Sequence, residues 1–211
     1  MSKLEIERAY FTFDRIALVG ALALRGSRIG EFFFRQAIFS PTAACAPKMK
    51  FARVRDEGRR VTATIKLRTS GPYEEEDEVT ISDYDTGVRM FGRLGLEKKY
   101  YLEKLREIWV VGDYEVVFDT YPGLPPYLEI EGPDEEALVR LAAGLGLTDE
   151  AQDIGAGELY LLHYGIPLER PQGDLTFENV GPTLGPLATR GRALFEERLD
   201  AQRRRVAALA L

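Results

Sequence analysis

Charged residues alternate with apolar residues in several short segments of this chain, the first of which is the stretch LEIERAYF at residues 4–11. Because successive side chains of a β-strand point to opposite faces, Glu5 and Glu7 would share one face and Leu4 and Ile6 the other. For one strand alone, a solvated face over a hydrophobic core explains this pattern. The pattern recurs along the chain, however, and the shared polar faces carry both signs of charge: the acids Glu5, Glu7, Glu76, Glu78, Asp119, Glu129 and Glu131, and the bases Arg53, Arg55, Lys66, Lys104 and Arg106.

Such a set of side chains is suited to binding a polyanion together with divalent cations. Two carboxylates about 4 Å apart repel by roughly 4 kcal/mol at an effective dielectric constant of about 20, so a cluster of acids requires cations. Hard ions such as Mg²⁺ or Mn²⁺ take oxygen ligands and usually leave positions for substrate phosphates. Arginine and lysine on neighbouring strands would bind the phosphate oxygens. The shared faces therefore predict a site for metal and polyphosphate.

The elements that must position these residues are short strands. Segments 51–56, 60–67 and 74–83 alternate in this way, and segment 101–133 indicates three further strands, interrupted by Gly112-Asp113 and by the turn at 122–126. If helices cover the apolar faces, the charged faces turn inward and the sheet closes around a polar lumen. The remaining acids Glu74, Glu75, Asp77 and Glu115 are expected to be solvated or structural, because they lie off the shared faces or near turns.

Helical spacing of apolar residues predicts helices at 83–96 and 133–146, and another in the second half of 150–164. The run IALVGALAL at 16–24 is too short to cross a bilayer and predicts a buried helix. We expect a first domain at residues 1–165. Residues 166–211 would form a connector rich in proline and glycine and an amphipathic C-terminal helix, packed on the domain or on a partner in a homodimer.

Composition limits the other functions of this chain of 211 residues. Its net charge of -6 argues against a nucleic-acid partner, because phosphate binding needs a basic surface. The single cysteine, Cys45, excludes an intramolecular disulfide and fits a reducing cytoplasm, where we expect the protein to reside. The single histidine, His163, has no second histidine or cysteine as a metal-binding partner and is expected to be structural. We expect no membrane partner.

The order of short motifs also resembles the CYTH family of triphosphate tunnel metalloenzymes. The motifs are EIE near the start, followed by RVR, TIK, EDEV, EKLR, VVFD and YLEIEGP, and the resemblance covers residues 3–165. The stretches RLGLEKKYYLEKLREIW and DTYPGLPPYLEIEGPDEE are most similar to the branch known as class IV adenylyl cyclases. The resemblance implies an α+β fold, a closed eight-stranded antiparallel β-barrel with flanking helices, whose tunnel binds a triphosphate-containing small molecule and divalent metal ions.

The charged residues take expected roles from this resemblance. The predicted catalytic residues are Glu5, Glu7, Lys66 and Arg106. The predicted triphosphate-binding residues are Arg53, Arg55, Lys66, Lys104 and Arg106. Mg²⁺ or Mn²⁺ would be held directly, or through neighbouring groups, by Glu5, Glu7, Asp119, Glu129 and Glu131. Support for the basic residues or for a second metal would come from Glu76 and Glu78.

The chain departs from the family signature Glu-x-Glu-x-Lys, because Ala9 stands at the lysine position. In hydrolytic members this lysine, often with a tyrosine from the segment after the first helix, orients the attacking water; here Phe39 takes the place of the tyrosine. A cyclase needs no external water, because the ribose hydroxyl of its substrate attacks the α-phosphorus. We therefore expect an adenylyl cyclase-like enzyme that converts ATP to cyclic AMP and pyrophosphate. The alternatives are a phosphohydrolase of inorganic triphosphate, thiamine triphosphate or nucleoside triphosphates, and a non-catalytic binding protein for nucleotides or polyphosphate.

Overall fold

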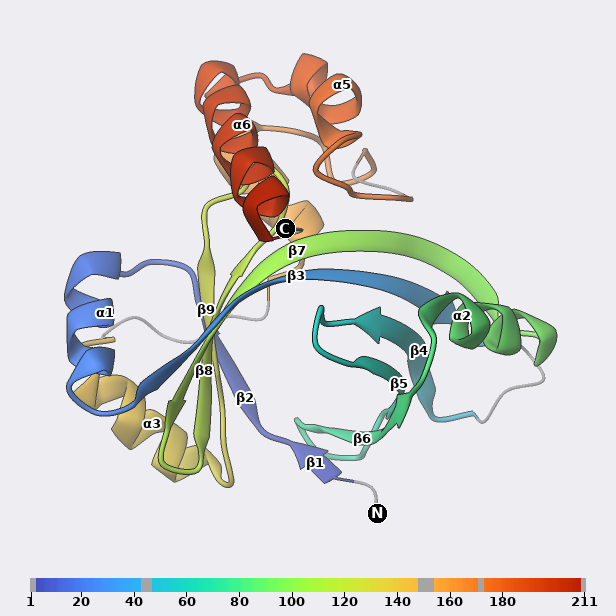
Figure 1. The fold of residues 1–211 in the computed structure, drawn as a ribbon, viewed down its shortest axis with the longest axis horizontal. Coiled ribbons are helices and arrows are strands. Elements are labelled where there is room, and N and C mark those ends of the chain that lie inside the picture. Colours follow the sequence, from blue (N-terminus) through green and yellow to red (C-terminus); the bar gives the residue numbers. More distant parts are fainter. Residues whose placement is uncertain (1–2, 43–46, 148–153, 171–172, 210–211) are drawn as a thin grey trace.

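Nine strands form one antiparallel sheet in the computed structural model, which describes residues 3–42, 47–147, 154–170 and 173–209. Cys45 lies outside these residues. The order of the strands in the sheet is β1-β6-β5-β4-β3-β7-β8-β9-β2 (Figure 1). The strands are β1 (Lys3–Glu5), β2 (Glu7–Tyr10), β3 (Ser27–Ser40), β4 (Met49–Asp56), β5 (Val61–Leu67), β6 (Glu74–Ile81), β7 (Glu97–Val111), β8 (Tyr114–Thr120) and β9 (Tyr127–Glu131).

The sheet is closed into a barrel by the N-terminal segment. β1 pairs with β6 and β2 pairs with β9, so the two ends of the sheet are adjacent residues of one chain, joined at Ile6. The carbonyl of Ile6 accepts a hydrogen bond from the backbone N–H of Gly132 at 3.1 Å. This confirms the predicted barrel with flanking helices, with one correction. The described residues form nine strands rather than eight, because the N-terminal strand is divided at Ile6.

Helices cover the outside of the barrel (Figure 1). They are α1 (Arg15–Ala23), α2 (Tyr84–Arg93), α3 (Glu135–Gly144), α4 (Ala156–Tyr164), α5 (Val180–Leu184), a 3₁₀ turn (Gly185–Leu187) and α6 (Arg192–Leu209). Asp14, Asp83 and Asp134 cap α1, α2 and α3, each accepting hydrogen bonds from backbone N–H groups of the first turn. Within the described residues, no helix combines the length and the hydropathy needed to cross a membrane.

The apolar faces of the strands point outward and pack against these helices. Ala52 and Val54 of β4 lie under α2, where Phe39 of β3 meets Phe91 edge to face at 5.4 Å between ring centroids. Leu18 and Leu22 of α1 are buried in a second cluster with α3 and the outer faces of β8 and β9. The prediction of a buried helix at 16–24 is only half right, because Ile16 and Leu24 are 87% and 85% exposed.

The alternation of charged and apolar residues did not predict β3. In the structure this strand pairs with β7 along most of its length. Its inward positions hold Phe32, Phe34, Gln36 and Ile38 rather than charged residues, so the sequence FFFRQAIFS lacks the signal found in the other strands. Two irregularities in its pairing with β7, at Arg28/Gly30 and at Ile38/Phe39, bend this long pair over the barrel (Figure 1).

The C-terminal helices pack on the loop between β8 and β9. The hydroxyls of Tyr160 and Tyr164 donate hydrogen bonds to the carbonyls of Pro122 and Gly123, and the side chain of Gln202 in α6 accepts one from the N–H of Gly123. Phe195 and Leu199 of α6 are buried in the same cluster. The C-terminal helix therefore packs on its own chain, while the division at residue 165 remains a prediction.

Candidate active site

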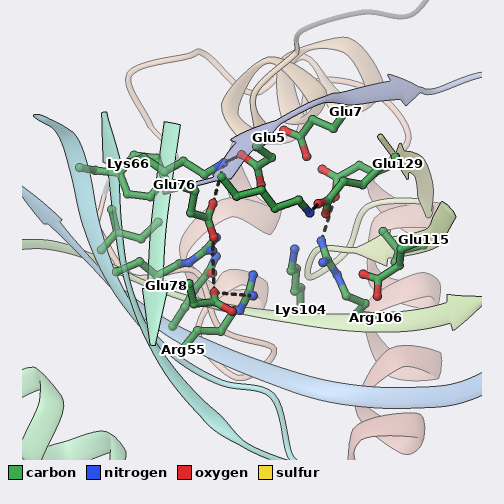
Figure 2. A pocket seen from close by; sticks show the side chains of 18 of the residues that line it. Glu5, Glu7, Arg55, Lys66, Glu76, Glu78, Lys104, Arg106, Glu115 and Glu129 are labelled. Atoms are coloured by element: carbon green, nitrogen blue, oxygen red, sulfur yellow. Dashed lines mark hydrogen bonds and ion pairs between the residues drawn. The ribbon is translucent and has the colours of Figure 1, made fainter. Parts of the chain in front are cut away.

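The barrel surrounds a cavity of about 750 Å³. It is lined by every predicted site residue except Asp119: Glu5, Glu7, Arg53, Arg55, Lys66, Glu76, Glu78, Lys104, Arg106, Glu129 and Glu131. Figure 2 shows these side chains converging from opposite walls, with Glu5, Glu7 and Glu129 on one side and Arg55 and Lys104 on another. The charged faces therefore turn inward, as the alternation predicted, and the roles assigned to the individual residues remain predictions.

Two arginines on β4 form one wall of the cavity. The Nε of Arg55 donates a hydrogen bond to Glu57 at 2.9 Å, and its guanidinium lies 5.5 Å from the ring centroid of Phe34. Burial, together with the positive charges of Arg53 and Arg106, lowers the pKa of Arg55 to about 10. Arg53 is paired more loosely, since its nearest acidic oxygens, on Glu76 and Glu78, are 3.7 and 3.9 Å away. Burial makes the positive charge of these arginines costly, so a bound anion would stabilise it.

Lys66 on β5 joins this wall to the N-terminal strand. Its ammonium pairs with the carboxylate of Glu5 and lies 3.6 Å from Glu76. The net effect of these neighbours is to raise the pKa of Lys66 despite its burial and to lower that of Glu5. The hydroxyl of Thr64 donates to Glu78 at 2.9 Å. In this structure Lys66 and Glu5 neutralise each other, so a bound phosphate and a bound cation would each replace one partner of the pair.

Asp119 lies behind the cavity wall and is fully buried. Its Oδ1 accepts a hydrogen bond from the Nε of Arg106 at 2.7 Å, and its other oxygen accepts from both Lys104 and Arg106. Burial acts to raise the pKa of Asp119, but the two cations outweigh it and hold this pKa well below its usual range. Of the two roles predicted for Asp119, the structure favours the indirect one, in which it fixes the side chains that face the ligand.

Lys104 is itself buried next to a second cation, Arg106. Burial and the nearby charge of Arg106 outweigh the attraction of Asp119 and Glu129, and they lower the pKa of Lys104 to about 8. Arg106 also donates to Glu129 at 2.8 Å, and the net effect of its acidic neighbours is to raise the pKa of Arg106. Both cations are therefore held in place at the floor of the cavity before any ligand binds.

Glu7 on β2 has no ion-pair partner among the described residues. Enclosure within the cavity and the negative charges of Glu129 and Glu5 raise its pKa to about 7. Glu7 lies opposite Glu131 in the register of β2 with β9, and Glu131 is paired with Lys3 at 2.5 Å. The acidic side of the cavity thus contains more negative charge than its own basic residues neutralise.

Several lining residues were missed or misjudged in the sequence. Glu115 was expected to be solvated, but it lines the cavity, because β8 continues the alternation up to the turn at Gly112 (Figure 2). Tyr127 lies two residues before Glu129 in β9, so the alternation that predicted Glu129 could also have predicted Tyr127. The hydroxyl of Tyr127 donates a hydrogen bond to Glu129 at 3.2 Å. Lys3 alternates with Glu5 in β1 and could also have been found. Other lining residues are uncharged or lie beyond a strand end: Gln36, Ile38, Phe51, Arg60, Asp113 and Tyr121.

Comparison with known protein families identifies the domain that forms this cavity. The CYTH domain model matches residues 3–152, which is more than half of the chain. The chain belongs to the CYTH family. No curated protein sequence matches it.

Solved structures share the fold of this CYTH domain at low sequence identity. A proposed adenylate cyclase from Vibrio parahaemolyticus is 18% identical with a TM-score of 0.61, and the match covers 75% of this chain and 98% of that one. The PH1012 protein from Pyrococcus horikoshii OT3 is 19% identical with a TM-score of 0.60, covering 74% and 98%. A conserved hypothetical protein from Pyrococcus furiosus is 18% identical with a TM-score of 0.59, covering 74% and 99%.

The surroundings of Ala9 show what replaces the lysine of the family signature in this CYTH domain. Ala9 packs beside the hydrophobic cluster that contains Tyr127, and the neighbouring Arg8 points outward to pair with Glu135 of α3 at 3.2 Å. No cation therefore replaces the signature lysine from this strand. The suggestion that Phe39 takes the place of a tyrosine is wrong, because its side chain is buried on the outer face under α2.

The family implies a divalent cation, and the carboxylate oxygens of this site are suitable ligands for one. The carboxylates of Glu5 and Glu129 are close enough to Glu7 to add to the effect of burial in raising its pKa, and a bound cation would lower this pKa again. In the described part of the chain, no three acidic, histidine or cysteine side chains are arranged to hold a metal as they stand. Metal binding would therefore require these carboxylates to move closer together.

Proposed function

We propose that this CYTH protein is a metal-dependent enzyme that acts on a triphosphate-containing substrate, with the conversion of ATP to cyclic AMP and pyrophosphate as its reaction. The observation that carries the proposal is the cavity, in which the basic side chains of β4, β5 and β7 face carboxylates of β1, β2 and β9. A polyphosphate chain would be bound by the former and its metal ion by the latter.

The residues of the chain would act mainly by positioning and by neutralising charge. Arg53 and Arg55 bind phosphate oxygens from one wall, and Lys104 and Arg106 bind them from the floor, where Asp119 holds both side chains in place. Because these donors are fixed before the ligand arrives, little reorganisation accompanies the increase of charge in the transition state. Lys66 changes its partner from Glu5 to the substrate.

Mg²⁺ or Mn²⁺ would be held by Glu5, Glu7 and Glu129, and when bound it would lower the pKa of a coordinated hydroxyl and neutralise phosphate charge. The absence of a cation at Ala9 supports cyclisation over hydrolysis, because the attacking hydroxyl of ATP is part of the substrate and needs no group to orient a water molecule.

The test is to incubate the purified protein with ATP and, separately, with inorganic triphosphate, in Mg²⁺ or Mn²⁺, and to separate the products by ion-exchange chromatography. We expect cyclic AMP and pyrophosphate from ATP, and loss of both in Glu5→Ala/Glu7→Ala. A matched control is Glu136→Ala, which removes an exposed carboxylate on α3. Release of orthophosphate that depends on Glu5 and Glu7 would replace the cyclase with a phosphohydrolase.

Ala9 also favours a second candidate, a protein that binds nucleotide or polyphosphate without turnover. Tight, metal-dependent binding of ATP with no product from either substrate would support it. In that case Ala9→Lys, which restores the family signature, should produce hydrolysis of inorganic triphosphate where the native protein has none. Absence of binding to ATP and to inorganic triphosphate would overturn both candidates.

A further inference from the structure

A second buried carboxylate holds two cations beside the cavity, as Asp119 does at its floor. Glu57 follows the last residue of β4 and is 3% exposed. Its Oε1 accepts a hydrogen bond from the Nε of Arg55 at 2.9 Å, and its Oε2 accepts one from the Nε of Arg60 at 2.8 Å. Burial acts to raise the pKa of Glu57, but the two arginines outweigh it and lower this pKa. Both oxygens of Glu57 are therefore used to position arginine side chains.

Arg60 lies at the opening of the cavity. It directly precedes β5 and lines the cavity, and its side chain is 53% exposed. Other exposed residues of the lining include Lys3, Asp113 and Pro133. Lys104, in contrast, lines the cavity and is buried. The exposed residues mark the side from which a ligand enters, and the buried cation marks the deep end.

This difference in burial predicts the direction in which a substrate enters. The free end of a triphosphate is its most highly charged part, and it is stabilised most by the buried cations Lys104 and Arg106. The organic group then stays at the opening, and the phosphate that carries it lies nearest Arg60. A guanidinium presents two parallel donors to a phosphate, and the contact with Glu57 fixes the direction in which Arg60 presents them.

We propose that Arg60 binds the phosphate that joins the triphosphate to its organic group, and that Glu57 is the positioning residue that holds Arg60 for this contact. This inference rests on the proposed function and adds one binding residue and one positioning residue to it. Both residues lie between the end of β4 at Asp56 and the start of β5 at Val61, outside the alternating faces that predicted the other site residues. A pyrophosphate held at the deep end is too short to reach Arg60, whereas a triphosphate, free or esterified, reaches it.

The neighbouring Arg59 provides a matched control. It is exposed and lies in the same turn, but its guanidinium lies 4.2 Å from the ring centroid of Phe32 and it does not line the cavity. The test measures dissociation constants by calorimetry in Mg²⁺ for pyrophosphate, inorganic triphosphate and ATP. Arg60→Gln should weaken the binding of triphosphate and of ATP about tenfold, and that of pyrophosphate less than about twofold. Arg59→Gln, which removes the same charge, should weaken all three less than about twofold.

The role of Glu57 is tested by combining two substitutions. If Glu57 holds Arg60 in place, the loss of triphosphate affinity caused by Arg60→Gln should fall from about tenfold to about threefold in a Glu57→Gln background. A merely structural role for Glu57 would lower the melting temperature and leave the loss at about tenfold, which would overturn the positioning role. Glu57→Asp, which keeps the charge on a shorter side chain, replaces Glu57→Gln if that variant does not fold.

The outcomes also separate this inference from the proposed function. Equal losses for pyrophosphate and triphosphate in Arg60→Gln would overturn the placement of Arg60 at the joining phosphate. Losses no greater than those in Arg59→Gln would overturn the contact itself, and in both cases the triphosphate site stands. If the native protein binds neither inorganic triphosphate nor ATP, the proposed function fails, and the inference about Arg60 fails with it.

Discussion

Asp119 shows how a single buried carboxylate organises the basic side of the cavity. It accepts hydrogen bonds from Lys104 and Arg106, both of which reach the cavity, while it does not line the cavity itself. Burial and the repulsion between the two cations together lower the pKa of Lys104, and the carboxylate of Asp119 opposes both effects and holds the cations adjacent. Its contribution to ligand binding is therefore made through stability and position rather than through contact.

Replacing Asp119 with alanine should leave two buried cations without their counterion. We expect the free energy of unfolding to fall by about 3 kcal/mol, as is usual when one partner of a buried ion pair is removed. Urea unfolding followed by circular dichroism measures this. Asp56→Ala is the matched control, because it breaks a partly exposed ion pair with Arg35 and should cost less than about 1 kcal/mol. Similar losses in both variants would contradict this role for Asp119.

The pKa of Lys104, about 8, predicts a dependence of ligand binding on pH. The charged ammonium binds the anion, so its contribution to affinity is present below pH 8 and is lost as the pH rises above it. Because the ligand also titrates, the quantity to follow is the ratio of the affinity of the native protein for inorganic triphosphate to that of Lys104→Met. This ratio should fall between pH 7 and pH 9.5. A constant ratio would show that Lys104 remains charged throughout.

At the scale of elements, the loop between β8 and β9 connects the barrel to the C-terminal helices. Gly123 in this loop has φ +76°, and a Cβ placed there would lie 2.3 Å from the ring of Phe195. Both the backbone conformation and the contact require glycine. Gly123 lies three residues after Thr120, the last residue of β8, so α6 stabilises the strand that carries Asp119.

Gly123→Ala should therefore destabilise the protein by about 2 kcal/mol or more, since it adds strain and a steric clash. Gly144→Ala is the contrasting variant. Gly144 lies in α3 with open space around its Cβ position, so alanine should raise stability by about 0.5 kcal/mol. Thermal melts of the two variants should shift in opposite directions. A fall in melting temperature in both variants would contradict the expectation that position 144 accommodates alanine.

The strands also show what could be predicted from the sequence and what could not. In β4, β5 and β9 the charge alternates with apolar residues because one face meets the lumen and the other meets the helices, so the position of Arg53, Lys66 and Glu129 followed from periodicity alone. In β3 the inward residues are uncharged, and the strand was missed. The outward direction of Phe39 also could not be predicted, because it depends on the register of β3, which the pairing with β7 determines.

At the scale of the whole molecule, the cavity is a charged interior inside a hydrophobic shell. Glu7, which has no ion-pair partner among the described residues, lies on β2, and Arg53 and Arg55 lie on β4, so the acid and the arginines line the cavity from different strands. Inorganic triphosphate should therefore raise the melting temperature by itself, and Mn²⁺ should add a further increase, because a ligand that binds only the folded state stabilises it.

The increases in melting temperature caused by inorganic triphosphate and by Mn²⁺ should respond to different substitutions. Glu7→Gln/Glu129→Gln should remove the increase due to Mn²⁺ and keep that due to inorganic triphosphate, whereas Arg53→Ala/Arg55→Ala should reduce the triphosphate increase. Differential scanning fluorimetry with and without EDTA measures both. Equal losses of both increases in each double variant would mean that the walls do not bind separate ligands. Arg140→Ala, on the exposed face of α3, serves as the charge control.

The division of the N-terminal strand at Ile6 also determines the order in which the barrel can be completed during synthesis. β1 pairs with residues 74–76 and β2 with residues 128–131, so β2 must wait for a partner made more than a hundred residues later, whereas the partner of β1 is made well before that. Such distant pairings form late, because the entropy of closing a long loop is lost before the contacts compensate for it. Glu7 thus enters the barrel late, and a nascent chain completes its acidic wall only after β9 has been made.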